Sequence, residues 1–340
     1  MGHRSFACLL SLFLAGLFIL RGALPADDAY IHARIAHNIL EHGVTDFNLS
    51  THALATSAPL WTLLLALAGV LGFEVLVAAK ALTLVGAVAN VLLAAELVWR
   101  LTESRLAASV ASILTAAVLL VSLFSVMETP LALSLWLLGV VLYMRGYVIS
   151  FVLLTLAVFL RVESAALLVV LLIYNCCRPS VPLLRSGIAS GVPLALGALI
   201  VCYDFGAIIP QGALAKELVY QMSTSQVLLE ALERWFGPFI FAVLGHHAVV
   251  YFILALVFLM TALGIALWWM PVRDRANRRG SVVLLLAGLL LFGAYVVKGV
   301  LIFDWYAPLY TLMILLGLLA LVSCSRSKYA WIAFAIFLLP

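Results

Sequence analysis

Residues 27–43 read DDAYIHARIAHNILEHG and place two adjacent aspartates directly after the first apolar segment of the chain. Two further acids share this setting between apolar segments, Glu128 in SVMETPLAL and Glu163 in RVES. An ionisable side chain at the edge of a membrane is costly unless it serves a site or pairs with a partner. These acids are therefore candidates for a functional site. The alternative is that Asp27 or Asp28 only caps a helix, where a carboxylate also favours the helix dipole.

The composition indicates that the solvent of most of this chain is lipid. Of the 340 residues, 66% are hydrophobic and 10% are charged, and the mean hydropathy is +1.23. These values exclude a water-soluble globule with one core. The apolar segments are much longer than the roughly ten-residue strands of a membrane barrel, and the lipid-exposed backbone must satisfy its own hydrogen bonds. We therefore predict an all-α, polytopic transmembrane bundle in a single domain, residues 1–340, without a separate soluble domain.

The lengths of the apolar segments predict about ten or eleven spans, because each span needs roughly 20 residues. The predicted spans are residues 5–24, 80–98, 107–126, 129–145, 146–160, 163–177, 187–203, 246–270, 281–301 and 305–322. Residues 329–340 make only half a span, so the chain is either cut short there or ends in a half-helix. Residues 59–73 are short, Gly-broken and followed by Glu74, and we interpret them as a re-entrant helix that does not cross.

The distribution of charge predicts the orientation. With the N-terminus in the cytoplasm, most of the 19 basic residues fall on inner loops and most of the 15 acids on outer loops, as the positive-inside rule requires. A crossing at residues 59–73 would reverse every later loop and place the basic stretch WMPVRDRANRRG outside. The predicted outer segments are a first loop, residues 25–79, and a long loop, residues 204–245. The net charge of +4 indicates no nucleic-acid partner, since the basic residues lie on inner loops.

The opening stretch itself has the pattern of an amphipathic helix on the outer membrane surface. Its wheel gathers Ile31, Ile35 and Ile39 on one strip, and Gly43 ends it. The polar residues opposite the strip are Tyr30, Arg34, His37, Asn38 and Glu41. The five cysteines lie in or next to spans without metal-type spacing, so they indicate neither a disulfide framework nor a zinc site.

The order of these features resembles the C-type membrane glycosyltransferases (GT-C). The shared order begins with an acid-led amphipathic helix after the first span, a Pro-Leu-Trp dip at residues 59–61 and a basic inner loop. METPL at residues 127–131 and a Pro-x-x-x-x-Ala-Lys stretch at residues 210–216 of the later outer loop follow. The likeness is to bacterial members related to protein O-mannosyltransferases and arabinofuranosyltransferases, and it covers residues 5–322. The chain departs from relatives where it reads TSAPLW, RVE and QG in place of TSPLW, RPE and NT.

The resemblance implies a reaction at the outer face of the bacterial cytoplasmic membrane. A sugar on a polyprenyl-phosphate donor passes, with inversion, to a glycan, lipid or protein acceptor. The position that matches the family's base is Asp28, with Asp27 its neighbour, and a carboxylate there can take a proton from the attacking acceptor. Glu128 matches the family's second acid, which orients the acceptor. In metal-using relatives, Asp28 and Glu128 would instead hold a divalent cation, Mg²⁺ or Mn²⁺.

The leaving lipid phosphate needs positive charge, and the chain offers three cations for it. These candidates are Lys216, Arg161 and Arg34. Further candidates for the rim of the acceptor site are Glu163, His32, Trp305 and Tyr306.

Two other functions fit the same composition. A transporter or flippase of a lipid-linked or small solute also carries acids and broken helices, but no inverted repeat is visible and the charges gather on one face. Glu96, the polar candidate deep in an early span, is more simply an ion pair with Arg100. A non-catalytic scaffold with the same fold is the third alternative, and the acids at both outer positions argue against it.

Overall fold

The computed structural model describes residues 2–49, 56–205, 222–224, 226–227, 275–298, 306–324 and 331. All regular structure in these residues is helical, which confirms the predicted class. The helices are α1 (His3–Arg21), α2 (Asp27–His42), α3 (Pro59–Val70), α4 (Val75–Thr102), α5 (Arg105–Phe124), α6 (Thr129–Met144), α7 (Ile149–Leu160), the 3₁₀ turn η1 (Val162–Ser164), α8 (Ala165–Cys177), α9 (Leu183–Phe205), α12 (Arg275–Lys298) and α13 (Ala307–Cys324). The predicted span 246–270 and most of residues 329–340 lie outside the described residues.

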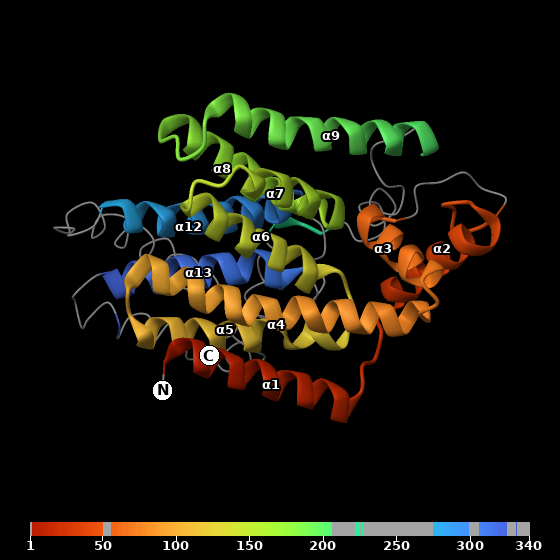
Figure 1. The fold of residues 1–340 in the computed structure, drawn as a ribbon, viewed down its shortest axis with the longest axis horizontal. Helices are drawn as coiled ribbons and strands as arrows, with labels where there is room; N and C mark the ends of the chain where they lie inside the picture. Colours follow the sequence, from red (N-terminus) through yellow and green to blue (C-terminus); the bar gives the residue numbers. More distant parts are fainter. Residues whose placement is uncertain are drawn as a thin grey trace.

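Six of these helices are long and apolar enough to cross a membrane: α1, α4, α5, α9 over Leu183–Tyr203, α12 over Gly280–Lys298, and α13. Shorter apolar helices lie where the re-entrant segment and three of the spans were predicted, namely α3, α6, α7 and Val162–Cys177, and they have fewer than the roughly 20 residues of a span. The chain is therefore an integral membrane protein, and the predicted segment boundaries agree with the helices to within a few residues. The long helices lie side by side, and α2 and α3 lie together at the end of the bundle where α1 ends and α4 begins (Figure 1).

Local chemistry sets where the helices start and stop. Gly43, in the left-handed conformation at φ +67°, ends α2 as its sequence predicts. Glu74 caps α4, since its carboxylate accepts from the amides of Leu76 and Val77 at 3.0 and 2.6 Å. Ser104 caps α5 in the same way through the amide of Ala107. Glu74 therefore stabilises the start of α4 as its N-cap, only a few residues after the end of α3.

One face of α4 holds the beginning of α6, the helix that follows Glu128. Thr83 Oγ1 donates to the carbonyl of Met127 at 3.1 Å, and Asn90 Nδ2 donates to the carbonyl of Pro130 at 2.6 Å. Between them Gly86 faces the backbone of residues 130–131, where an added Cβ would lie 2.7 Å from Leu131 N. The two helices approach this closely only because the residue is glycine, a pattern typical of membrane helix pairs.

We expect Gly86→Ala to destabilise the fold. The new Cβ meets backbone atoms that cannot rotate away, so α4 and α6 must separate, at a cost of about 1–3 kcal/mol. The free energy of unfolding, measured in detergent micelles, checks this. Gly16→Ala in α1 is the matched control, because nothing lies within 4 Å of its added Cβ, and it should leave the stability unchanged or raise it. Equal effects of the two variants would contradict the close approach.

Candidate functional site

The site candidates meet around Arg161, which lies between α7 and η1 and is only 3% exposed. Its Nη1 donates to Glu128 Oε1 at 2.6 Å. Its Nη2 and Nε donate to Glu163 Oε1 and Oε2 at 2.8 and 3.3 Å, which is the two-bond geometry favoured between a guanidinium and a carboxylate. One buried cation thus joins the two acids that the sequence singled out from separate turns.

Two tyrosines from the C-terminal part of the described chain complete this cluster. Tyr295 Oη, from α12, donates to Glu163 Oε1 at 2.8 Å. The guanidinium carbon of Arg161 lies 4.0 Å from the ring centroid of Tyr306, which precedes α13 and is buried. The two tyrosine rings are stacked, with centroids 6.2 Å apart. A cation over an aromatic face is attracted by the ring, so Tyr306 supports Arg161 on the side that the carboxylates leave open.

The electrostatics of the cluster favour a charged arginine. Burial by itself lowers the pKa of Arg161, but the carboxylates of Glu163 and Glu128 more than offset this and hold its pKa well above the ordinary value. The two carboxylates also exceed the single cation in charge. Arg161 therefore serves these acids as a fixed counter-ion, and most of its donors are already engaged.

His32 extends the cluster into α2 and α3. Its Nε2 lies 3.9 Å from Glu128 Oε2, and its Nδ1 lies 3.1 Å from Thr56 Oγ1 and 3.3 Å from Thr62 Oγ1. The two threonine hydroxyls are 3.1 Å apart, and all of these side chains are buried. Glu128 Oε2 is itself buried and has no hydrogen-bond partner within the described chain. That oxygen and His32 therefore face one another at the centre of the site.

Asp28 lies at the accessible edge of this network. It is partly exposed and stands one helical turn before His32, so the two residues share a face of α2. The start of α2 is tied to the turn before Glu128, because the amide of Ala26 donates to the carbonyl of Ser125 at 3.0 Å. Asp27 is exposed, and its Oδ1 accepts from the amide of Asp28 at 2.9 Å. The N-cap of α2 is Ala26, without a side-chain cap bond, so the expectation that one of the two aspartates caps the helix was wrong.

Backbone strain accompanies the Glu128 turn. Val126 is fully buried and has φ +57°, in the left-handed region that a β-branched side chain rarely adopts. Such a conformation costs of order 1–3 kcal/mol and persists only where the surroundings enforce it. Here the bonds from Thr83, Asn90 and Ala26 fix the chain on both sides of the turn.

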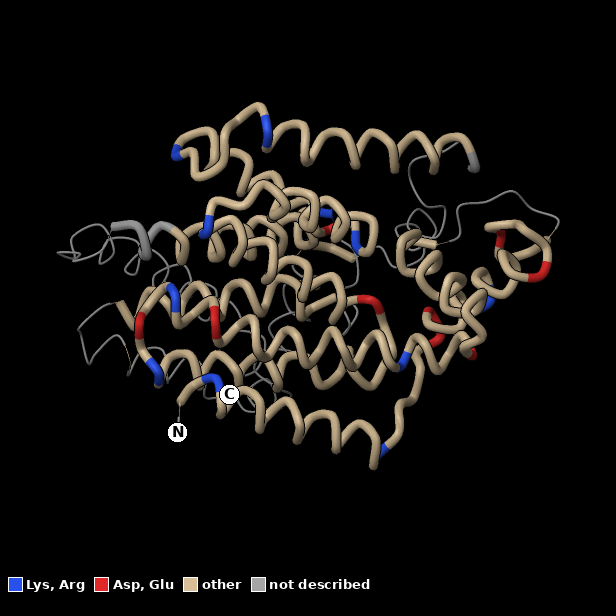
Figure 2. Tube along the Cα trace, viewed as in Figure 1, with Lys and Arg blue, Asp and Glu red and all other residues tan. Residues whose placement is uncertain are grey.

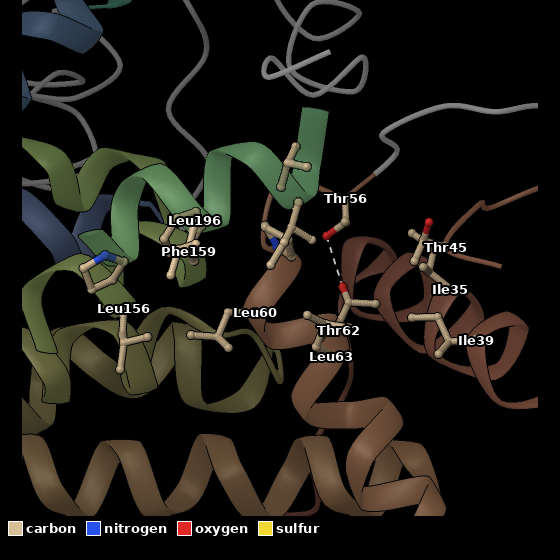
Figure 3. Close-up of a pocket in the computed structure, with 15 residues that line it drawn as sticks. Ile35, Ile39, Thr45, Thr56, Leu60, Thr62, Leu63, Leu156, Phe159 and Leu196 are labelled. Atoms are coloured by element: carbon tan, nitrogen blue, oxygen red, sulfur yellow. Dashed lines mark hydrogen bonds between the residues drawn. The ribbon is translucent and has the colours of Figure 1, made fainter. Parts of the chain in front are cut away.

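An apolar pocket opens beside the threonines of the network. Its volume is about 340 Å³, and it lies between α2, α3, α7 and α9 (Figure 3). Ile35, Leu60, Leu156, Phe159 and Leu196 line it. Its polar groups are the hydroxyls of Thr45, Thr56 and Thr62, and Figure 3 shows the latter two pointing toward each other. Such a space fits an apolar group and offers hydroxyls at one side only.

The structure places the remaining predicted site residues as follows. Arg34 is exposed, donates to the carbonyl of Phe47 at 3.4 Å and lies 5.7 Å from its ring centroid. Lys216 and Trp305 lie outside the described residues. His32, expected at the rim, is instead buried in the network.

The predicted wheel of α2 was wrong at Asn38. This residue was placed with the polar face but is buried, because its Nδ2 donates to the carbonyls of Asp46 and Phe47, where the chain folds back over the helix. Of the predicted apolar strip, Ile35 is fully buried, and Ile31 and Ile39 are half-buried.

Three members of the network were not found from the sequence, namely Thr56, Thr62 and Tyr295. A single hydroxyl in an apolar helix usually bonds its own backbone and carries no pattern of its own. The only signal was that Thr56 opens the TSAPLW stretch. Within the described chain, no three His, Cys, Asp or Glu side chains gather as metal ligands, so the divalent cation stays a prediction.

The sequence and the structure have no detected relative. Comparisons with protein-family models, with curated proteins and with solved structures found no match. The function of this chain is therefore proposed below from its geometry and from the order of its motifs.

We expect Arg161→Met to be strongly destabilising. It would leave the buried Glu128 and the partly buried Glu163 without their cation, and removing one partner of a buried pair typically costs about 3–5 kcal/mol. Unfolding in detergent micelles by a chemical denaturant measures it. Arg145→Met is the matched control, because its ion pair with Glu96 at 3.7 Å is 43% exposed and should contribute about 1 kcal/mol or less. A loss no greater than that of the control would show that the buried pair is dispensable.

Proposed function

We propose that this protein is an integral-membrane glycosyltransferase that moves a sugar from a polyprenyl-phosphate donor to an acceptor hydroxyl. The observation that carries the proposal is the meeting of three features at one end of the bundle. The start of α2 with Asp28 is bonded to the Glu128 turn, and an apolar pocket lies against the same network. An accessible carboxylate, a buried polar framework and room for an apolar chain are the three parts that such a transfer needs.

The proposed chemistry is a single displacement with Asp28 as the general base. Asp28 takes the proton of the acceptor hydroxyl while the oxygen of that hydroxyl attacks the anomeric carbon. The bond from the anomeric carbon to the phosphate oxygen breaks on the opposite side, and the polyprenyl phosphate leaves. The configuration at the anomeric carbon is therefore inverted. Asp28 suits the role better than Glu128, which is buried and paired with Arg161, and it stands one helical turn before His32, on the face of α2 that meets the network.

Glu128 and His32 are proposed to position the acceptor side of the site. Glu128 Oε2 is the one oxygen of the Arg161 cluster that lacks a hydrogen-bond partner among the described residues, and it faces His32 on the same helix face as Asp28. Arg161 itself is engaged by two carboxylates, so its proposed role is to hold Glu128 and Glu163. The charge that stabilises the leaving phosphate is then left to Lys216 or Arg34, as proposed from the sequence.

The pocket supports a donor with an isoprenoid chain. Its walls are almost entirely aliphatic and aromatic, and its hydroxyls lie toward His32. A lipid chain in this space would bring its phosphate end toward the polar network. The acceptor, whether glycan, lipid or protein, would approach from the exposed side of Asp28.

The proposed orientation places this site at the outer face of the bacterial cytoplasmic membrane. Helix α3 has 12 residues, about 18 Å of helix against about 30 Å of hydrocarbon, which supports a re-entrant segment rather than a crossing. Lys and Arg lie at both ends of the bundle and are more frequent at the end far from α2 and α3, whereas acids are more frequent near those two helices (Figure 2). The positive-inside rule then assigns the basic end to the cytoplasm.

Transfer of radiolabelled sugar from polyprenyl-phosphate donors by isolated membranes tests the proposal. We expect Asp28→Asn to lower the rate by about 10²–10⁴-fold, the usual cost of losing a general base, with donor binding unchanged. Glu41→Gln, which removes an exposed acid from the same helix, is the matched control and should retain the wild-type rate.

Full activity of Asp28→Asn at matched protein levels would rule out Asp28 as the base. If wild-type membranes consume no donor but move a lipid-linked solute between leaflets, the transporter alternative replaces the enzyme.

A further inference from the structure

A second charged cluster lies at the opposite end of the bundle from Arg161, where α1 begins and α4 and α6 end (Figures 1 and 2). Arg100 Nη2 lies 2.6 Å from Glu96 Oε1, and Arg4 Nη2 lies 3.1 Å from Glu96 Oε2. Arg145 Nη2 is 3.7 Å from Glu96 Oε1. The predicted ion pair of Glu96 and Arg100 is thus confirmed as part of a larger group. Three guanidiniums from three helices share one carboxylate, which leaves a surplus of positive charge.

The cluster also has hydrogen-bond donors in excess. A guanidinium has five N–H groups, and the two oxygens of Glu96 can accept from only a few of them. Arg100 Nε is buried and has no partner among the described residues, and the same holds for Nε2 of His3, whose ring stacks on Trp99 at 4.6 Å. The side chains of Arg4 and Arg145 are 73% and 43% exposed, so the cluster is accessible from outside.

We propose that Arg4, Arg100 and Arg145 bind the phosphate group of an anionic phospholipid in the leaflet at this end of the bundle. Guanidinium groups bind phosphate oxygens through charge-assisted, often two-bond contacts, and basic pockets between membrane helices bind anionic head groups. The lipid is a structural or regulatory ligand, separate from any donor at the Asp28 end. The proposal is independent of the glycosyltransferase assignment.

The position of the cluster favours a lipid over a soluble anion. Helix α4 has 28 residues, about 42 Å, so its last turns extend beyond the hydrocarbon to the level of the head groups. Leu9, Leu12 and Phe13 of α1 are 55%, 69% and 64% exposed and provide an apolar surface for acyl chains next to Arg4. The following turn exposes one acid and one base, Glu103 and Arg105, and so adds no net charge.

Native mass spectrometry of the delipidated full-length protein, titrated with phosphatidylglycerol or phosphatidylcholine, tests this. We expect the wild type to prefer phosphatidylglycerol, and the double variant Arg4→Gln/Arg145→Gln to bind it about 10- to 30-fold more weakly, from the usual contribution of a basic residue near an anionic lipid. Glu96→Gln should bind phosphatidylglycerol more tightly than the wild type, since the carboxylate no longer competes with the phosphate.

The matched control is Arg178→Gln/Arg185→Gln, which removes the same number of exposed positive charges from the next connection and should leave the affinity unchanged. If this control loses as much affinity for phosphatidylglycerol as the double variant, the loss is an effect of net charge alone and the proposal is overturned. Displacement of phosphatidylglycerol by millimolar inorganic phosphate would identify a soluble-anion site instead. If the double variant fails to fold, the proposal is still tested by the lipid preference of the wild type and by the affinity of Glu96→Gln. If the wild type shows no preference for phosphatidylglycerol and Glu96→Gln does not bind it more tightly, the cluster is purely structural and the proposal is overturned.

Discussion

The structure at the Asp28 end depends on burying one guanidinium between two carboxylates. Arg161 is held by Glu128 from the start of α6 and by Glu163 from η1, and it is covered by Tyr306 from the segment before α13. Each carboxylate would be very costly in this apolar setting without the cation, and the cation equally without them. The ends of α6, α7, α12 and α13 are therefore mutually fixed, and α2 and α3 join them through His32 and the two threonines.

The acids at this end of the bundle differ in exposure and in pairing. Glu128 is buried, the side chain of Glu163 is 17% exposed, and both are paired with Arg161, so they maintain geometry. Asp28 is partly exposed on the neighbouring helix, so solvent can reach its side chain. The strained Val126 and the close contact at Gly86 show how much of the surrounding backbone is devoted to keeping the Glu128 turn in place.

The fold class and most helix positions could be predicted from the sequence because the information is local. A run of about 20 apolar residues makes a helix wherever it occurs in lipid, and residues such as Gly43 mark the ends. The importance of Glu128, Arg161 and Glu163 was also visible, since charge is rare in this chain. Their mutual bonding was not, because it joins residues far apart: Tyr295 and Glu163 are 132 positions apart. Asn38 was misplaced for the same reason, as its partners lie in a loop that a helical wheel does not contain.

Helix α9 gives the apolar pocket one wall that differs from the others. Only 11% of its membrane-length segment is buried, and its main packing partners are α7 and α8. Pro193, inside this helix, lines the pocket and lacks the amide that would complete the backbone ladder. The walls formed by α2 and α3 are anchored in the buried network, whereas α9 can bend without breaking it. A long-chain molecule of the kind proposed would therefore reach the pocket sideways, from within the bilayer and past α9, and would not need to leave the lipid phase to reach the polar end.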